Sequence, residues 1–421
     1  MKVSLPRNCD NCGQPAAEDP VRVTFINRFY WPEEPATAQL LTDLAEALAA
    51  RGHPITVIAS RPADPGISCA ETRAGVKILR VRGTHLGRAR LAGRMIDFTT
   101  FLLAAGWRLT WTLQRGDLVV AMTDPPLLGI AVFPIARLRG ARVLHWAQDI
   151  YPEVAIALSP HGFVRGLCAA FRPLRNFVWR RSTGCVALGE DMAALMTQAG
   201  VPPAKVAIIP NWAPAGLEPQ SLESAMALRR AWDLDGRFVV AYSGNLGRVH
   251  DLDPVLDVAS SLRHVPGIVF VFVGGGAQRA AMEERVVRER LANVRFQPAQ
   301  PRRNLTEVLA LGDVHLVTLH PGCTQLVFPS KLYGIAAVGR PVLFIGPRNC
   351  EVARVVTGRG FGLAFARDDT EAMARALRDL ANDPARCATF ASAAAAFSRR
   401  EGRLTQAVFA WSGVLTREAA C

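Results

Sequence analysis

Three segments in the second half of the chain carry residues suited to binding phosphate. They are SGNLGR (243–248), GGGAQR (274–279) and FPSKLYG (328–334). Glycines let a backbone approach a ligand closely, and Arg248 and Lys331 supply positive charge. Ser330 precedes a short helix, which we expect it to cap, and the free amide groups at such a helix end favour an anion. The pattern predicts a diphosphate site formed by Gly244, Asn245, Gly247, Arg248, Gly274, Gly275, Ser330 and Lys331.

A second group of polar residues lies in the first half, in the sequence HWAQDIYPE (145–153). Asp149 and Glu153 lie beyond the end of an apolar strand, where carboxylates can open onto a cleft and take part in acid–base chemistry. His145 lies within the strand, so it is either a third catalytic candidate or a histidine of the core.

Two further patterns resemble metal sites but do not predict one. Cys9 and Cys12 form a C-x-x-C pair without the second pair of ligands that zinc needs. The sequence DLD (251–253) precedes Pro254 and a helix, where an aspartate is a common N-cap. We therefore expect no metal.

Apolar runs rich in β-branched residues alternate with helical patterns along most of the 421 residues. This alternation is typical of parallel sheets covered by helices on both faces. It stops at the Pro/Gly-rich stretch 213–220 and then starts again. The sequence predicts an α/β protein of two Rossmann-like, doubly wound domains that face each other across a cleft. The expected divisions are a flexible tail (1–20), an N-terminal domain (21–212), a linker (213–220), a C-terminal domain (221–399) and a helical tail (400–421) that packs back toward the N-terminal domain.

The formal net charge of +13 indicates an anionic partner. Twelve Lys/Arg face three Asp between Arg73 and Arg142, and a second cluster between Arg165 and Arg181 has no acidic residue. In the helix expected at 95–113, Met95, Phe98, Leu102, Leu109 and Leu113 can face a core. The other aromatic residues do not all fit that stripe, and an aromatic, arginine-rich helix suits a membrane surface. The predicted membrane contacts are Arg94, Trp107, Arg108 and Trp111, with simple burial or a solvated face as the alternatives.

No apolar run reaches the length of a spanning helix, and no secretory signal is visible. Nine cysteines without framework spacing suit a reducing compartment. We therefore expect a cytoplasmic protein, peripheral on the inner membrane if the aromatic helix binds lipid.

Several quoted motifs together resemble those of the GT-B glycosyltransferases of family 4 (group 1), in the branch that builds exopolysaccharides of the colanic-acid type. They span about 21–400 and are RFYWPEEPATAQLLTDLAEALAARGH, DIYPE, VPPAKVAIIPNW, SGNLGRVHDLDPVL, FVGGG and PSKLYGIAAVGRPVLFIG. The resemblance implies a hexosyltransferase that uses a UDP- or GDP-sugar as co-substrate in its C-terminal domain and no cofactor. It also implies metal-independent transfer, with retention of configuration, to an acceptor in the N-terminal domain, a saccharide linked to polyprenyl diphosphate.

The resemblance also suggests roles for individual residues. It places DIYPE beside the reacting sugar, so Asp149 becomes the preferred acid/base or positioning residue. The loop 32–38, with Glu33, Glu34 and Thr37, should lie under the donor phosphates or the acceptor. Two glutamates common in the family are replaced by Leu326 and Gly334. Glu351 can substitute for one of them, or it can simply favour the dipole of its own helix.

Other functions are less consistent with the sequence. An NAD-dependent dehydrogenase needs G-x-G-x-x-G after its first strand, and none follows the strand at 21–29. A nucleotide-sugar 2-epimerase shares the GT-B architecture but has no use for an Arg/Trp-rich helix. A non-catalytic scaffold need not keep Arg248 and Lys331, and no nucleic-acid-binding module is present.

Overall fold

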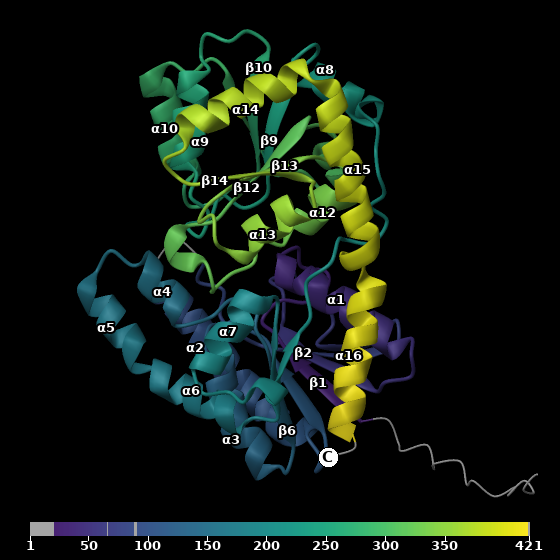
Figure 1. The fold of residues 1–421 in the computed structure, drawn as a ribbon. Helices are drawn as coiled ribbons and strands as arrows, with labels where there is room; N and C mark the ends of the chain where they lie inside the picture. Colours follow the sequence, from purple (N-terminus) through teal and green to yellow (C-terminus); the bar gives the residue numbers. More distant parts are fainter. Residues whose placement is uncertain (1–20, 65, 88–90, 420–421) are drawn as a thin grey trace, which may run out of the picture.

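The computed structural model describes residues 21–64, 66–87 and 91–419 and has two α/β domains, each built on a largely parallel sheet (Figure 1). The predicted fold class is confirmed. The tail 1–20, with Cys9 and Cys12, lies outside the described residues.

The first domain has an eight-stranded sheet of order β3-β4-β2-β1-β5-β6-β7-β8, parallel except where β3 pairs with β4. Its strands are β1 (Val23–Ile26), β2 (Ile55–Ser60), β3 (Ala70–Arg73), β4 (Val76–Val81), β5 (Leu118–Ala121), β6 (Arg142–Trp146), β7 (Gly184–Ala187) and β8 (Val206–Ile208). Its helices are α1 (Ala36–Ala49), α2 (Leu91–Thr112), α3 (Leu128–Leu138), α4 (Glu153–Leu158), α5 (Gly162–Ala170), α6 (Arg172–Arg181), α7 (Glu190–Gln198) and the 3₁₀ turn η1 (Pro203–Lys205).

The second domain has a six-stranded parallel sheet of order β11-β10-β9-β12-β13-β14. Its strands are β9 (Phe238–Ser243), β10 (Ile268–Val273), β11 (Val294–Gln297), β12 (Val314–Thr318), β13 (Val342–Ile345) and β14 (Gly362–Phe365). Its α-helices are α8 (Met226–Ala231), α9 (Asp253–Ser261), α10 (Arg279–Glu289), α11 (Leu305–Ala310), α12 (Lys331–Ala337), α13 (Glu351–Gly358), α14 (Thr370–Asn382) and α15 (Pro384–Glu401). Its 3₁₀ turns are η2 (Leu222–Ala225), η3 (Arg302–Asn304) and η4 (Pro321–Cys323).

The chain crosses between the domains twice. The stretch 213–220 leads into the second domain, and α16 (Leu404–Ala419) returns along the first one after α15 (Figure 1). At the crossing the Ala213 amide donates to the Gly402 carbonyl at 2.9 Å. Trp411 of α16 is fully buried against Phe25 and Trp146. The last helix therefore completes the core of the first domain.

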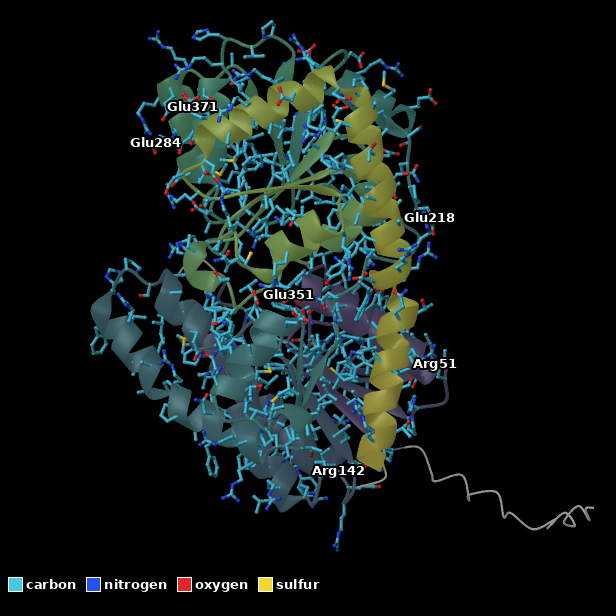
Figure 2. All side chains as sticks on the ribbon, in the orientation of Figure 1. Arg51, Arg142, Glu218, Glu284, Glu351 and Glu371 are labelled. Atoms are coloured by element: carbon cyan, nitrogen blue, oxygen red, sulfur yellow. The ribbon has the colours of Figure 1, made fainter. Side chains whose placement is uncertain are left out.

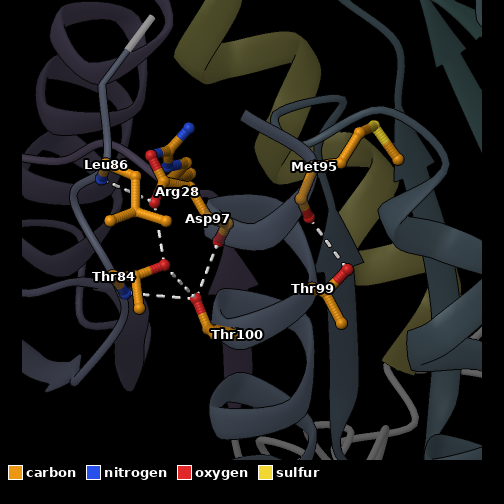
Figure 3. A network of polar contacts seen from close by, with 7 residues as sticks. All are labelled: Arg28, Thr84, Leu86, Met95, Asp97, Thr99 and Thr100. Carbon is orange, nitrogen blue, oxygen red and sulfur yellow. Dashed lines mark hydrogen bonds and ion pairs between the residues drawn. The ribbon is translucent and has the colours of Figure 1, made fainter. Parts of the chain in front are cut away.

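Asp97, near the start of α2, fixes how that helix is rotated (Figure 3). Its carboxylate accepts hydrogen bonds from Thr84 Oγ1 at 2.8 Å and from the Leu86 amide at 2.9 Å. Burial opposes ionisation, but these bonds outweigh it and lower the pKa of Asp97. With Asp97 held inside, Phe101 turns into the core and Met95 is 54% exposed, so the expectation that Met95 faces the core is wrong.

Candidate active site

Backbone contacts between two loops form the floor of the predicted phosphate site. The loop after β9 and the loop after β10 pair through the Gly244 amide and the Val273 carbonyl (2.9 Å), and through Leu246 and Gly275 (2.8 Å). A Cβ added at Gly274, whose φ is +138°, would lie 2.2 Å from the Gly244 carbonyl oxygen. Only glycine allows so close an approach in that backbone conformation.

Lys331 projects from the start of α12 toward this floor. Its Nζ lies 3.5 Å from the centroid of the Tyr242 ring and 3.7 Å from the point where a Cβ of Gly244 would be. The nitrogen is buried and has no hydrogen-bond partner among the described residues. Burial therefore lowers the pKa of Lys331 well below its usual value. An anion bound beside Gly244 would supply the missing counter-charge.

Two other residues that are predicted to bind the diphosphate have side chains available to do so. Asn245 and Arg248 are exposed, and Arg248 makes no hydrogen bond or ion pair with any residue that the structure describes. The Gly247 carbonyl is held by Gln278 Nε2 at 2.7 Å. Ser330 makes no side-chain capping bond, because its own backbone is helical (φ −60°, ψ −23°), so the expectation that it caps α12 is wrong. Its role toward phosphate stays a prediction.

Asp149 lies where the two domains meet. It pairs with Val327 in an isolated antiparallel bridge, and the neighbouring Ile150 amide donates to the Leu326 carbonyl at 2.8 Å. Burial, and then the negative charge of Asp124, raises the pKa of Asp149 to about 7. The carboxyl can therefore gain or lose a proton near neutral pH, as a general acid or base requires.

Asp124 is a residue that sequence reasoning missed. It follows β5 in the sequence TDPP, as Asp149 follows β6, and these two strands are neighbours in the sheet. The signal was present in the sequence, because the carboxyl ends of adjacent parallel strands meet at one edge. Its backbone carbonyl accepts a 2.7 Å hydrogen bond from the Arg28 amide.

The other two catalytic candidates have partners of their own. His145 is buried, its Nε2 lies 2.9 Å from Ser182 Oγ, and burial followed by the charge of Arg175 lowers its pKa to about 3. These contacts are those of a core histidine, which is one of the two roles that the sequence allowed for His145. The Glu153 carboxylate pairs with Arg175 at 2.6 Å and Arg172 at 3.2 Å.

Replacing Asp149 with asparagine should stabilise the protein at alkaline pH. A folded-state pKa of about 7, above the ordinary 3.8, makes the folded protein bind this proton more tightly than the unfolded chain. Stability from this group is therefore lost as the pH rises from about 4 to about 7. Asparagine avoids that loss, which amounts to roughly 1–3 kcal/mol between pH 5 and pH 8. Melting curves at the two pH values test this, and an equal change in Tm for both proteins would contradict it.

The loop before α1 is fixed by arginine contacts. Arg73 lies over the Trp31 ring at 4.4 Å, and Arg80 Nη2 donates to the Trp31 carbonyl at 2.9 Å. Beyond Trp31, Glu33 is partly buried, Glu34 is exposed and Thr37 is in the first turn of α1. Their predicted contact with substrate stays a prediction.

Glu351 lies at the boundary between the domains (Figure 2). Its carboxylate accepts from the Asp191 amide at 3.2 Å, while its own amide donates to Asp191 Oδ2 at 2.7 Å. Arg354 adds a 2.7 Å ion pair to Asp191. At the N-termini of α7 and α13, each helix thus places a carboxylate on a backbone amide of the other helix, across the interface. The Glu351 carboxylate thus lies at the N-terminus of α7 in the other domain, and not at that of its own helix, as the sequence had suggested. Its contact with the donor stays a prediction.

The positions that lack the family glutamates are closely packed. Leu326 is 6% exposed and belongs to a core cluster with Ala147 and Ile150 of the first domain. A Cβ at Gly334 would lie 3.3 Å from Leu309 Cδ1 and 3.7 Å from Leu217 Cδ1. Apolar packing thus occupies both positions, against the first domain at Leu326 and against α11 and the linker at Gly334.

A cavity of about 460 Å³ lies between the domains. From the first domain it is lined by Glu153, Ile156, Ala157, Arg172 and Asp191, and from the second by Asn349 and residues between Pro321 and Leu326. It is therefore close to the residues that follow Asp149 on one side and to the loop that leads to Lys331 on the other.

The remaining candidates are on surfaces. Trp107 and Trp111 are 68% and 70% exposed with ring centroids 5.7 Å apart, and Arg94 and Arg108 are exposed on the same helix. Asp251 of the DLD sequence forms an ion pair with Arg367. Within the described ranges no three His, Cys, Asp or Glu side chains are grouped as metal ligands.

Comparisons with known proteins identify the family of the chain and support its fold. Residues 37–212 match the glycosyl transferase 4-like domain, and residues 227–397 match the glycosyl transferases group 1 model. The chain is 29% identical to the glycosyltransferase WbjE of Pseudomonas aeruginosa over 67% of its length and 70% of that protein. It is 27% identical to the colanic acid biosynthesis glycosyl transferase WcaI of Escherichia coli, over 83% and 89% of the two chains. The structure of Anabaena HepE with UDP-glucose has the same fold, with a TM-score of 0.71 at 15% identity over 94% and 99% of the chains.

Proposed function

This chain belongs to the GT-B glycosyltransferases of family 4 (group 1), and from that membership we propose that it moves a sugar from a UDP- or GDP-sugar to a lipid-linked saccharide. The product is an intermediate of an exopolysaccharide or another cell-surface polysaccharide. WcaI acts, by its name, in colanic acid synthesis, which supports this choice of pathway class.

The observation that carries the proposal is the buried Nζ of Lys331 beside Gly244, which has no hydrogen-bond partner in the part of the chain that the structure describes. An ammonium group without a counter-ion is costly inside a protein, and a bound diphosphate removes that cost. The exposed Arg248 adds a second cation at the same loop. HepE, of the same fold, is bound to UDP-glucose in its structure, which is consistent with a nucleotide-sugar here.

The proposed reaction breaks the bond between the sugar C1 and the diphosphate and forms one from C1 to the oxygen of an acceptor hydroxyl, with retention of configuration. The hydroxyl proton passes to Asp149 or to the leaving diphosphate. Lys331 and Arg248 stabilise the negative charge that develops on the leaving diphosphate, and no metal is part of this scheme. Asp149 is the acid/base or positioning residue on the acceptor side.

The acceptor that we propose is a saccharide on polyprenyl diphosphate at the cytoplasmic face of the inner membrane. No described helix combines the length and apolar character needed to cross a bilayer. Attachment is therefore proposed to be peripheral, through Arg94, Trp107, Arg108 and Trp111 of α2, which are exposed.

A thermal-shift screen of nucleotide-sugars tests the donor. The true donor at 100 times its Kd should stabilise the protein by about 2.7 kcal/mol. Turnover of that donor should then require a lipid-linked saccharide. Conversion of the donor without any acceptor would instead indicate an epimerase, and a panel without any stabilising nucleotide would contradict the proposal.

A further inference from the structure

Helices α5 and α6 carry a continuous apolar stripe that nothing in the described chain covers. Helix α5 buries none of its residues, and α6 buries only the side with Arg175, Val178 and Trp179. The exposed apolar residues recur every three or four positions, so they line one side of the two successive helices. This α5–α6 stripe consists of Phe163, Leu167, Phe171, Leu174 and Phe177, whose exposed fractions are between 42% and 82%.

The charge around the α5–α6 stripe is of one sign. No aspartate or glutamate occurs between residues 154 and 189, whereas five arginines do. Arg175 is buried against Glu153, but Arg165, Arg172, Arg180 and Arg181 are exposed. A helix with an apolar face and basic flanks suits the interface of a bilayer that contains anionic lipids.

The α5–α6 stripe also has a defined position relative to the cleft. Arg172, next to Phe171, lines the cavity between the domains together with Glu153. In Figure 1, α4, α5 and α6 form the outer edge of the first domain, on the side away from α16. Helix α3 contacts both α6 and α2, so the exposed tryptophans of α2 belong to the same helical layer.

We propose that the α5–α6 stripe is embedded in the surface of an anionic bilayer and holds the mouth of the cleft there. A lipid-linked acceptor then reaches the cleft past Arg172 while its chain remains in the membrane. The identity of that acceptor rests on the proposed function, whereas the lipid contact does not. The α5–α6 stripe thus acts as a membrane anchor besides α2.

Sedimentation of the full chain with vesicles tests the anchor. The vesicles contain equal parts of phosphatidylglycerol and phosphatidylcholine and no acceptor. Phe163→Ser combined with Leu167→Ser should weaken partitioning at least tenfold, because both side chains are exposed in the free protein and lose apolar contact only with lipid. The matched control is Val287→Ser with Phe409→Ser, which removes two side chains that are each 77% exposed on α10 and α16. The control should bind as the wild type does.

Two further measurements distinguish binding to lipid from association of two copies of the chain. Arg165→Gln combined with Arg181→Gln should weaken binding to these anionic vesicles. The same double change should not alter binding to pure phosphatidylcholine vesicles, which we expect to be weaker for the wild type as well. High salt should likewise weaken binding only to the anionic vesicles. Unchanged partitioning of the Phe163/Leu167 variant would overturn the proposal. So would light scattering in which the wild type is a dimer and this variant a monomer, since the α5–α6 stripe would then join two copies. Failure to bind any nucleotide-sugar would contradict the proposed function and leave the vesicle result intact.

Discussion

Asp149→Asn is expected to lower kcat by about 10²- to 10⁴-fold, the usual contribution of a general acid or base, while donor affinity changes little. The carboxyl lies at the junction of the domains and its pKa is raised to about 7. Asparagine keeps the shape of the aspartate side chain and removes its titratable proton. A loss in kcat without a loss in binding indicates a group that acts in the transition state.

Asp235→Asn is the matched control, because Asp235 is exposed in a loop of the second domain. It should leave kcat unchanged. Asp124→Asn adds a diagnostic shift: removing the negative neighbour lowers the pKa of Asp149, so the limb of the pH–rate profile that reports Asp149 should move to lower pH. If Asp149→Asn retains wild-type turnover, attention passes to Glu153 and His145.

Lys331→Met should weaken the binding of UDP or GDP by about 10- to 150-fold, the loss of roughly 1.5–3 kcal/mol for a charge-assisted contact. The same change should raise Tm in the absence of ligand, because it replaces a buried amino group that has no hydrogen-bond partner in the described residues with an apolar chain of similar length. Weaker nucleotide binding together with a higher Tm would show that Lys331 serves to bind the nucleotide, because the loss of a structural residue would lower Tm.

Calorimetry with both nucleotides measures the affinity, and Lys77→Met serves as control because Lys77 is exposed on β4. Equal nucleotide affinities for wild type and Lys331→Met would remove Lys331 from the donor site. If Lys331→Met binds nucleotide normally but melts at a lower temperature than the wild type, the main role of Lys331 is its contact with the Tyr242 ring.

Much of the fold could be predicted from the sequence, because buried parallel strands leave a strong local signal. The apolar runs of β1, β2, β5 and β10 are examples, and all four are completely buried or nearly so. Strand β3 was not predicted: its residues AETR include no large apolar side chain and none of them is buried, so pairing with β4 is what holds them in a sheet. The helices α4 to α6 were also missed: α5 has no buried face that would produce a core pattern, and α4 and α6 bury only one and three residues.

The sequence by itself determined the two-domain α/β architecture, the glycine loops and the position of Lys331, because each depends on residue types at fixed spacing along one segment. Only the tertiary structure decided which polar groups are free. It gave His145 and Glu153 partners from other elements and turned Glu351 toward α7. It brought Asp124 near enough to Asp149 to raise the pKa of that residue, and it left the Lys331 Nζ without a hydrogen-bond partner among the described residues. The physical reason is that charge and pKa depend on burial and on neighbours distant in the chain, which local spacing does not encode.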